Sequence, residues 1–181
     1  MRIAVTGHTS GLGKSFFDTY LDRGYAVKGF SRKNGYDLSQ SAIQEKFVDE
    51  ISQEIDVFIN NAHAGWAQCE LLYKVCERWK DKKKTIINIG SISSDGNKDY
   101  AHKYAVEKAA LEKAVAQLNN VQNVLCKVVL IKPGWILNER TSRMTVKDPM
   151  LSLQHVVDLV DFILELPFDL HIPSVSLCRK E

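Results

Sequence analysis

The stretch Thr6-Gly7-His8-Thr9-Ser10-Gly11-Leu12-Gly13 follows an apolar run at 2–6 and precedes a helical pattern at 13–23. Glycine permits a tight turn and lets the backbone approach a ligand without a Cβ atom in the way. The helix that follows presents free N–H groups and the positive end of its dipole to an anion. Between a first strand and a first helix, this string predicts a site for a dinucleotide pyrophosphate. A merely structural turn is the alternative.

Short β-rich runs alternate with helical patterns along the rest of the chain. This alternation predicts parallel strands joined by helical crossovers, and therefore an α/β sheet with helices on both faces. No repeat, linker or domain boundary interrupts the pattern, so we expect residues 1–181 to form a single Rossmann-like, doubly wound domain with three layers, α/β/α. The expected strands are 2–6, 25–30, 55–59, 85–89, 127–131 and 174–178, and the expected helices are 13–23, 41–53, 66–81, 104–119 and 153–166.

The composition is that of a soluble globular protein, with 45% hydrophobic and 25% charged residues among 181. The net charge of +2 gives no electrostatic case for a nucleic-acid or membrane partner. No apolar run approaches the ~20 residues that span a bilayer, and we expect no signal peptide because the N-terminus runs straight into a strand. The four cysteines show no metal-ligand spacing. We therefore expect no metal site and a reduced, cytoplasmic location.

The residues after the second expected strand indicate which dinucleotide is bound. A carboxylate there would favour a free ribose 2′-hydroxyl, whereas a basic residue favours a 2′-phosphate. This chain has Ser31-Arg32-Lys33 and no acid. Arg32 can fork onto a phosphate, Ser31 can hydrogen-bond it and Lys33 adds charge, so NADP(H) is expected in preference to NAD(H); alternatively, both cations are ordinary loop charges. Asp37 could accept a hydrogen bond from the adenine amino group.

Three side chains form a candidate acid–base site. Tyr104 and Lys108 are four residues apart in a helical pattern, and Ser91 lies thirteen residues before the tyrosine. A phenol titrates near ~10 and is a poor acid or base at neutral pH, but a lysine ammonium one turn away favours the phenolate. A serine hydroxyl can hold a substrate oxygen beside the phenol. Taken alone, this spacing can also be accidental, with a mild effect on helix stability.

Six motifs resemble those of the short-chain dehydrogenases/reductases, and they occur in family order over nearly the whole chain. They are Thr6-Gly7-x-x-x-Gly11-x-Gly13, Asp37-Leu38, Asn60-Asn61-Ala62, Asn88-Ile-Gly-Ser91, Tyr104-x-x-x-Lys108 and Lys132-Pro133-Gly134. Each motif is weak alone, but their joint occurrence is specific.

The resemblance implies an NADPH-dependent oxidoreductase that transfers hydride between a nicotinamide and the carbonyl or alcohol carbon of a small substrate. Tyr104 would give or take the proton, Lys108 would lower the pKa of Tyr104 and bind the nicotinamide ribose, and Ser91 would polarise the substrate oxygen. Ser93 and Ser94 are rival serines, but family spacing favours Ser91. The residues expected to contact the cofactor are Gly7, Thr9, Ser10, Gly11, Leu12, Gly13, Ser31, Arg32, Asp37, Leu38, Asn60, Asn61, Ala62, Tyr104, Lys108, Pro133, Gly134, Trp135 and Ile136. A homodimer or homotetramer is also implied. The alternative is a non-catalytic, dinucleotide-binding regulatory or scaffold protein of the same fold.

The chain departs from the family pattern in four places. His63 stands where glycine is usual, and it either lines the site or is accommodated by a reshaped loop. The stretch 32–37 is too short for the usual crossover helix, which predicts a shortened sheet edge. No clear counterpart exists for the helix asparagine that organises a proton-relay water. Finally, the segment 137–150 is a brief substrate lid with Arg140, Arg143 and Lys147, which favours a small polar or anionic substrate.

Overall fold

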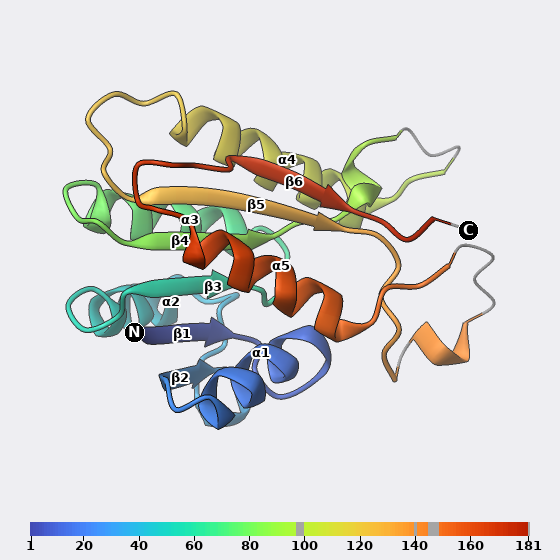
Figure 1. Cartoon of the computed structure of the whole chain (residues 1–181). Coiled ribbons are helices and arrows are strands. Elements are labelled where there is room, and N and C mark those ends of the chain that lie inside the picture. Colours follow the sequence, from blue (N-terminus) through green and yellow to red (C-terminus); the bar gives the residue numbers. More distant parts are fainter. Residues whose placement is uncertain (97–99, 140, 145–148, 181) are drawn as a thin grey trace.

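The computed structural model describes residues 1–96, 100–139, 141–144 and 149–180. Within these residues, six parallel strands form one sheet in the order β2-β1-β3-β4-β5-β6 (Figure 1). The strands are β1 (Arg2–Thr6), β2 (Ala26–Phe30), β3 (Val57–Asn60), β4 (Thr85–Ile89), β5 (Lys127–Pro133) and β6 (Ser174–Leu177). The central strands are buried on both faces, as their continuous apolar runs require.

Helices cover both faces of this sheet (Figure 1). Their bounds are α1 (Gly11–Asp22), α2 (Ser41–Ile51), α3 (Ala67–Trp79), α4 (Lys103–Leu118) and α5 (Leu153–Glu165). One apolar core lies between the sheet and α1 with α5, and a second lies between the sheet and α2, α3 and α4. In α5 the apolar stripe of Val156, Val157, Val160 and Ile163 is fully buried against the first of these cores. The predicted three-layer α/β/α architecture is therefore confirmed.

The sheet ends at β2. The described residues 31–40 contain a short 3-10 helix, η1 (Arg32–Asn34), and no strand. The sheet edge is therefore shortened, as the sequence predicts. Asn34 fixes this turn, because its Oδ1 accepts from the Ser31 backbone N at 2.8 Å and its Nδ2 donates to Gly29 O at 2.8 Å. The turn places Arg32 at the carboxyl edge of the sheet.

The order of the strands reverses around β1, which has β2 on one side and β3 on the other. In doubly wound sheets, ligands bind at the carboxyl ends of the strands where the order reverses. Here that place is bounded by Thr6, Phe30 and Asn60, the last residues of β1, β2 and β3.

Candidate active site

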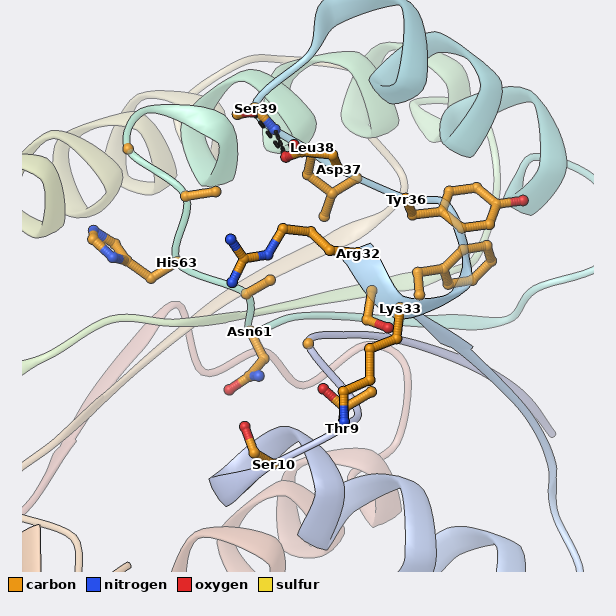
Figure 2. A pocket seen from close by; sticks show the side chains of 16 residues that line it. Thr9, Ser10, Arg32, Lys33, Tyr36, Asp37, Leu38, Ser39, Asn61 and His63 are labelled. Carbon is orange, nitrogen blue, oxygen red and sulfur yellow. Dashed lines mark hydrogen bonds between the residues drawn. The ribbon is translucent and has the colours of Figure 1, made fainter. Parts of the chain in front are cut away.

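A cleft of about 650 Å³ lies over the carboxyl ends of β1, β2 and β3. In Figure 2, Thr9 and Ser10 lie beside the start of α1 on one side, and Arg32 and Asp37 lie on the other. The cleft brings together many of the residues predicted to contact a cofactor, namely Gly7, Thr9, Ser10, Ser31, Arg32, Asp37, Leu38, Asn61 and Ala62.

The first turn is built so that only glycine fits at two positions. Gly7 has a φ of +73°, in the left-handed region. A Cβ on Gly13 would lie 2.2 Å from Gly7 O and 2.5 Å from Asn61 Nδ2. The start of α1 therefore packs directly on the turn, and Thr9 and Ser10 just before it line the cleft, whereas Gly11, Leu12 and Gly13 are not part of the lining. This arrangement fits a dinucleotide pyrophosphate.

Thr6 and Asn61 hold the floor of the cleft together. The Thr6 Oγ1 accepts from the backbone N of Asn61 at 3.0 Å and of Ala62 at 3.1 Å. Asn61 Nδ2 in turn donates to Thr6 O at 3.0 Å. These bonds join the ends of β1 and β3 and hold the loop that follows β3 beside the glycine turn.

Asn60 requires a correction. Its side chain is completely buried and donates to Asn88 Oδ1 and to Gln68 O, both at 2.9 Å. It therefore ties β3 to β4 and α3, and it has no surface with which to make the predicted cofactor contact.

The basic residues after β2 face the cleft. Figure 2 shows the guanidinium of Arg32 extending toward Asn61 and His63, and Arg32 donates no hydrogen bond within the described part of the chain. Ser31 differs, because it is buried and its hydroxyl donates to Asn34 Oδ1 at 3.2 Å. A phosphate would have to displace that bond to reach the Ser31 hydroxyl.

Asp37 also lines this end of the cleft. The hydroxyl and backbone N of Ser39 donate to Asp37 Oδ1 at 2.8 and 3.2 Å, and these bonds lower the pKa of Asp37. The carboxylate is thus held ionised as a hydrogen-bond acceptor, which suits the predicted contact with an amino group.

Lys108 lies deep beside the tyrosine with which it was paired. Its Nζ is 5.5 Å from the centroid of the Tyr104 ring and donates to Gln68 Oε1 and to Ile89 O, both at 2.7 Å. The residue is 3% exposed, and this burial lowers the pKa of Lys108 to about 8, while the nearby Glu107 carboxylate acts in the opposite direction. The amine therefore loses its proton closer to neutral pH than an ordinary lysine does.

Gln68 is a site residue that the sequence reasoning missed. Its Nε2 donates to Asn60 O at 2.8 Å and to Ile89 O at 3.2 Å, which leaves Oε1 facing Lys108. The available signal was a polar residue on the apolar face of a helix, because Gln68 is in register with Leu71, Leu72 and Val75, which are buried. From α3, Gln68 therefore supplies a fixed hydrogen-bond acceptor to the Lys108 ammonium. This is the same helix that lacks a counterpart of the family's relay asparagine.

Ser91 follows β4 and caps η2 (Ile92–Ser94), which packs against α4. Its Oγ accepts from the backbone N of Ser93 at 3.1 Å. The rival Ser94 is engaged elsewhere, since its hydroxyl lies 2.8 Å from both Ser91 O and Glu112 Oε2. Because Lys108 is bonded to Ile89 O, the serine and the lysine meet at the same strand end.

The predicted nicotinamide-side loop lies at the carboxyl end of β5, outside the lining of the cleft. Pro133, Gly134, Trp135 and Ile136 are held there by a bond from Gly134 N to Leu177 O at 2.8 Å and by a bridge between Ile136 and Leu151. In the following segment, Arg140 and Lys147 lie outside the described residues. Arg143 is exposed and pairs with Glu139 at 3.0 Å.

His63 lines the cleft and reaches toward Tyr104. The centroids of the two rings are 5.0 Å apart, edge to face, and His63 Nε2 lies 2.7 Å from Glu107 Oε2. Of the two outcomes considered for this position, the structure shows the one in which the side chain enters the site. No group of three or more His, Cys, Asp or Glu residues suited to a metal ion occurs among the described residues. No helix within the same part of the chain is long and apolar enough to cross a bilayer.

No protein-family model matches the chain, and comparison with curated proteins finds no match. Solved structures do share its fold. Serine dehydrogenase from Escherichia coli superposes with a TM-score of 0.75 at 17% identity, over 99% of this chain and 98% of that chain. An alcohol dehydrogenase from the archaeon Thermococcus sibiricus, complexed with 5-hydroxy-NADP, gives 0.76 at 17% identity, over 100% and 99%. The 3-alpha-hydroxysteroid dehydrogenase from Pseudomonas sp. B-0831, complexed with NADH, gives 0.74 at 18% identity, over 98% and 94%. The Rossmann-like fold implied by the sequence resemblance is therefore confirmed.

Proposed function

We propose that this protein is a short-chain dehydrogenase/reductase that interconverts the alcohol and carbonyl forms of a small molecule with a nicotinamide dinucleotide. The buried ammonium of Lys108 carries the proposal. It lies beside the Tyr104 ring and is bonded to the end of β4, two residues before Ser91. A regulatory protein needs the cleft, but it has no use for a buried amine next to a phenol. The dehydrogenases that share the fold support the same conclusion.

In this proposal each polar side chain has one task. A nicotinamide dinucleotide bound in the cleft would supply or accept the hydride. Tyr104 gives its proton to the carbonyl oxygen in reduction and takes it back in oxidation, and Ser91 hydrogen-bonds that oxygen. The Lys108 ammonium favours the phenolate by its positive charge. Positioned acid–base help of this kind is typically worth ~10²–10⁴ in rate.

NADP(H) is the proposed cofactor because Arg32 and Lys33 reach into the cleft where an acid would otherwise select NAD(H). A charge-assisted hydrogen bond is worth about 1.5–3 kcal/mol. We expect Arg32→Ala to weaken NADPH binding roughly tenfold to a hundredfold while changing NADH binding by less than about threefold. Calorimetric titration of both cofactors measures this, with Arg179→Ala, outside the cleft, as the control. An equal loss for the two cofactors would remove Arg32 from this role.

The competing hypothesis is a non-catalytic regulatory or scaffold protein that only binds the dinucleotide. Purified protein assayed with NADPH and a panel of small aldehydes, ketones and keto-sugars separates the two. We expect turnover that falls by at least about 10² in Tyr104→Phe, which still binds the cofactor, and a wild-type rate in the matched control Tyr73→Phe. Cofactor binding without turnover by any member of the panel would favour the regulatory protein. Equal turnover by Tyr104→Phe would exclude the acid–base role of this tyrosine.

A homodimer or homotetramer is the proposed assembly, through the outer faces of α3 and α4. Small side chains on α4 would permit such a contact, but Ala105 and Ala114 pack inside the protein's own core. Ala116 remains exposed, and Tyr73 and Val106 add exposed apolar surface on the same two helices. Light scattering of the eluting protein during gel filtration measures the assembly, and a monomer at working concentration would contradict the proposal.

A further inference from the structure

An imidazole and a buried carboxylate join the loop after β3 to α4. His63 Nε2 lies 2.7 Å from Glu107 Oε2, and the Glu107 side chain is 3% exposed whereas that of His63 is 38% exposed. The other carboxylate oxygen, Oε1, is buried and accepts no hydrogen bond within the described residues; Lys103 Nζ, on an exposed side chain, lies 3.6 Å from it. Glu107 therefore contacts His63 through Oε2 and pairs with Lys103 through Oε1.

Tyr104 needs a source of protons if the proposed reaction occurs. Each reduction removes one proton from the phenol, and that proton must be replaced before the next turnover. Lys108 can give a proton to the phenolate, but its two protein contacts, Gln68 Oε1 and Ile89 O, are carbonyl oxygens with no proton to return. Lys108 is also almost completely buried. Its route to solvent on the protein side is closed by these contacts.

We propose that His63 returns the proton to Tyr104 from the solvent of the cleft, with Glu107 as the positioning residue that holds the His63 ring through Nε2. This inference rests on the proposed dehydrogenase function. It gives a role to the two side chains that the acid–base trio leaves unused. Histidine is the side chain that gains and loses a proton near neutral pH, which this task requires.

The proton balance of the step follows from the contacts. In reduction, Tyr104 Oη gives its proton to the substrate oxygen and is left as a phenolate. The His63 imidazolium gives a proton to the phenolate, and the neutral imidazole then takes one from solvent. A carboxylate can only accept, so Nε2 keeps its hydrogen toward Glu107 and Nδ1 is the nitrogen that exchanges. The imidazole lies directly beside the phenol, because the two rings pack edge to face with their centroids 5.0 Å apart.

The charged and titratable groups around His63 distinguish it from a second histidine. Glu107 and Tyr104 contact it from α4, with Lys103 beside the carboxylate and Lys108 beside the phenol, and Arg32 extends toward it across the cleft (Figure 2). His102 also flanks Tyr104, with ring centroids 6.0 Å apart, but among the described residues its Nδ1 is buried without a hydrogen-bond partner. No carboxylate among the described residues pairs with His102, which therefore serves as the matched control.

The first experiment compares His63→Ala with His102→Ala in reduction of a carbonyl that the wild-type protein accepts, between about pH 6 and about pH 9. We expect kcat to fall roughly tenfold to a hundredfold in His63→Ala, most strongly at high pH where solvent protons are scarce. Millimolar imidazole should restore part of this loss in His63→Ala and none in His102→Ala, which keeps the wild-type rate within about twofold. A merely structural tie would not respond to imidazole. An active wild type with His63→Ala unchanged across this range, or slowed but not rescued, overturns the inference and leaves the proposed function standing.

The second experiment needs no turnover. Proton NMR at fixed pH follows the ring signal of His63, identified by its loss in His63→Ala. We expect Glu107→Gln to shift this signal, because the imidazole loses its contact with a carboxylate oxygen. An unchanged signal overturns the pairing on which the relay depends. If the wild-type protein binds NADPH but reduces no carbonyl, the proposed function fails and the relay fails with it, whatever the NMR result.

Discussion

Replacing Gln68 with leucine keeps Lys108 in place but destabilises its charged form, so it tests whether the positive charge of Lys108 matters for the reaction. The side chain of Gln68 gives Lys108 Nζ one of its two carbonyl acceptors, at 2.7 Å, and donates to Asn60 O and Ile89 O. Leucine has a similar size and offers neither function. Gln68→Leu therefore leaves a buried ammonium with one protein acceptor and removes the donor from two carbonyl groups.

The size of the effect follows from the lost bond to the ammonium. A hydrogen bond to a charged group is worth about 1.5–3 kcal/mol, and one pKa unit corresponds to about 1.4 kcal/mol. Burial already lowers the pKa of Lys108 to about 8, and a lysine is charged below its pKa, so the ammonium is lost as the pH rises through this value. Without Gln68 that loss should occur roughly one to two pH units lower. Since the ammonium is the form that favours the phenolate, reduction at neutral pH should fall several-fold and recover toward about pH 6.

The assay is the pH dependence of kcat/KM for reduction, which reports the ionisation of the free enzyme. In the wild type the falling limb should lie near the pKa of Lys108, about 8. The matched variant Gln68→Glu keeps an acceptor and adds negative charge beside the ammonium, so its limb should move to higher pH. Urea unfolding of each variant, with an expected loss of about 2–3 kcal/mol in Gln68→Leu, shows that folded protein is measured. If both variants kept the wild-type limb, Gln68 would not act on Lys108 and the reasoning would be refuted.

Two further substitutions test the turn and the core. Gly13→Ala puts a Cβ 2.2 Å from Gly7 O, so the turn must shift and NADPH affinity, measured by calorimetry, should fall at least about tenfold; Gly11→Ala meets open space and should cost only the ~1–2 kcal/mol in stability that a φ of +52° imposes. Equal NADPH affinities in Gly13→Ala and wild type would contradict the role of the glycine turn in binding the pyrophosphate. Phe47→Ala empties a fully buried site and should lower the free energy of unfolding by about 3–5 kcal/mol in urea, whereas the exposed Phe162→Ala should change it by less than about 0.5 kcal/mol. A small effect at Phe47 would mean that the core closes around the gap.

The strands and helices could be predicted from the sequence because their signals are local. Apolar runs bounded by loops and an apolar stripe of helical period are visible within a window of a few residues. No end of a predicted element differs from the structure by more than two residues. The glycine turn was equally readable, since the constraint at Gly7 is a backbone angle and the constraint at Gly13 is a contact within the same turn.

The contacts that decide the chemistry could not be predicted in the same way, because they depend on where distant elements meet. His63 and Glu107 are 44 residues apart, and Gln68 and Lys108 are 40 apart. The local settings of His63 and Gln68 mark them as unusual but do not name a partner, and only the packing of α3 and the loop after β3 against α4 brings the partners together. Asn60 shows the converse, because a motif residue at a strand end was predicted to touch a ligand and is instead enclosed by its own neighbours.

Gln68 and His63 together determine how protons reach the proposed acid–base site. Gln68 fills the space beside Lys108, so the ammonium is bound tightly but cut off from solvent on that side, and proton exchange is left to the cleft, where His63 lies. Removing the Gln68 side chain with alanine would leave a small polar cavity faced by Asn60 O, Ile89 O and Lys108 Nζ, which are enough partners to hold a water. That water would open a second path to the amine. The loss caused by His63→Ala should therefore be smaller in the Gln68→Ala background than in the wild type, and a double-mutant cycle on kcat would measure the difference as a coupling between two residues that make no contact with each other.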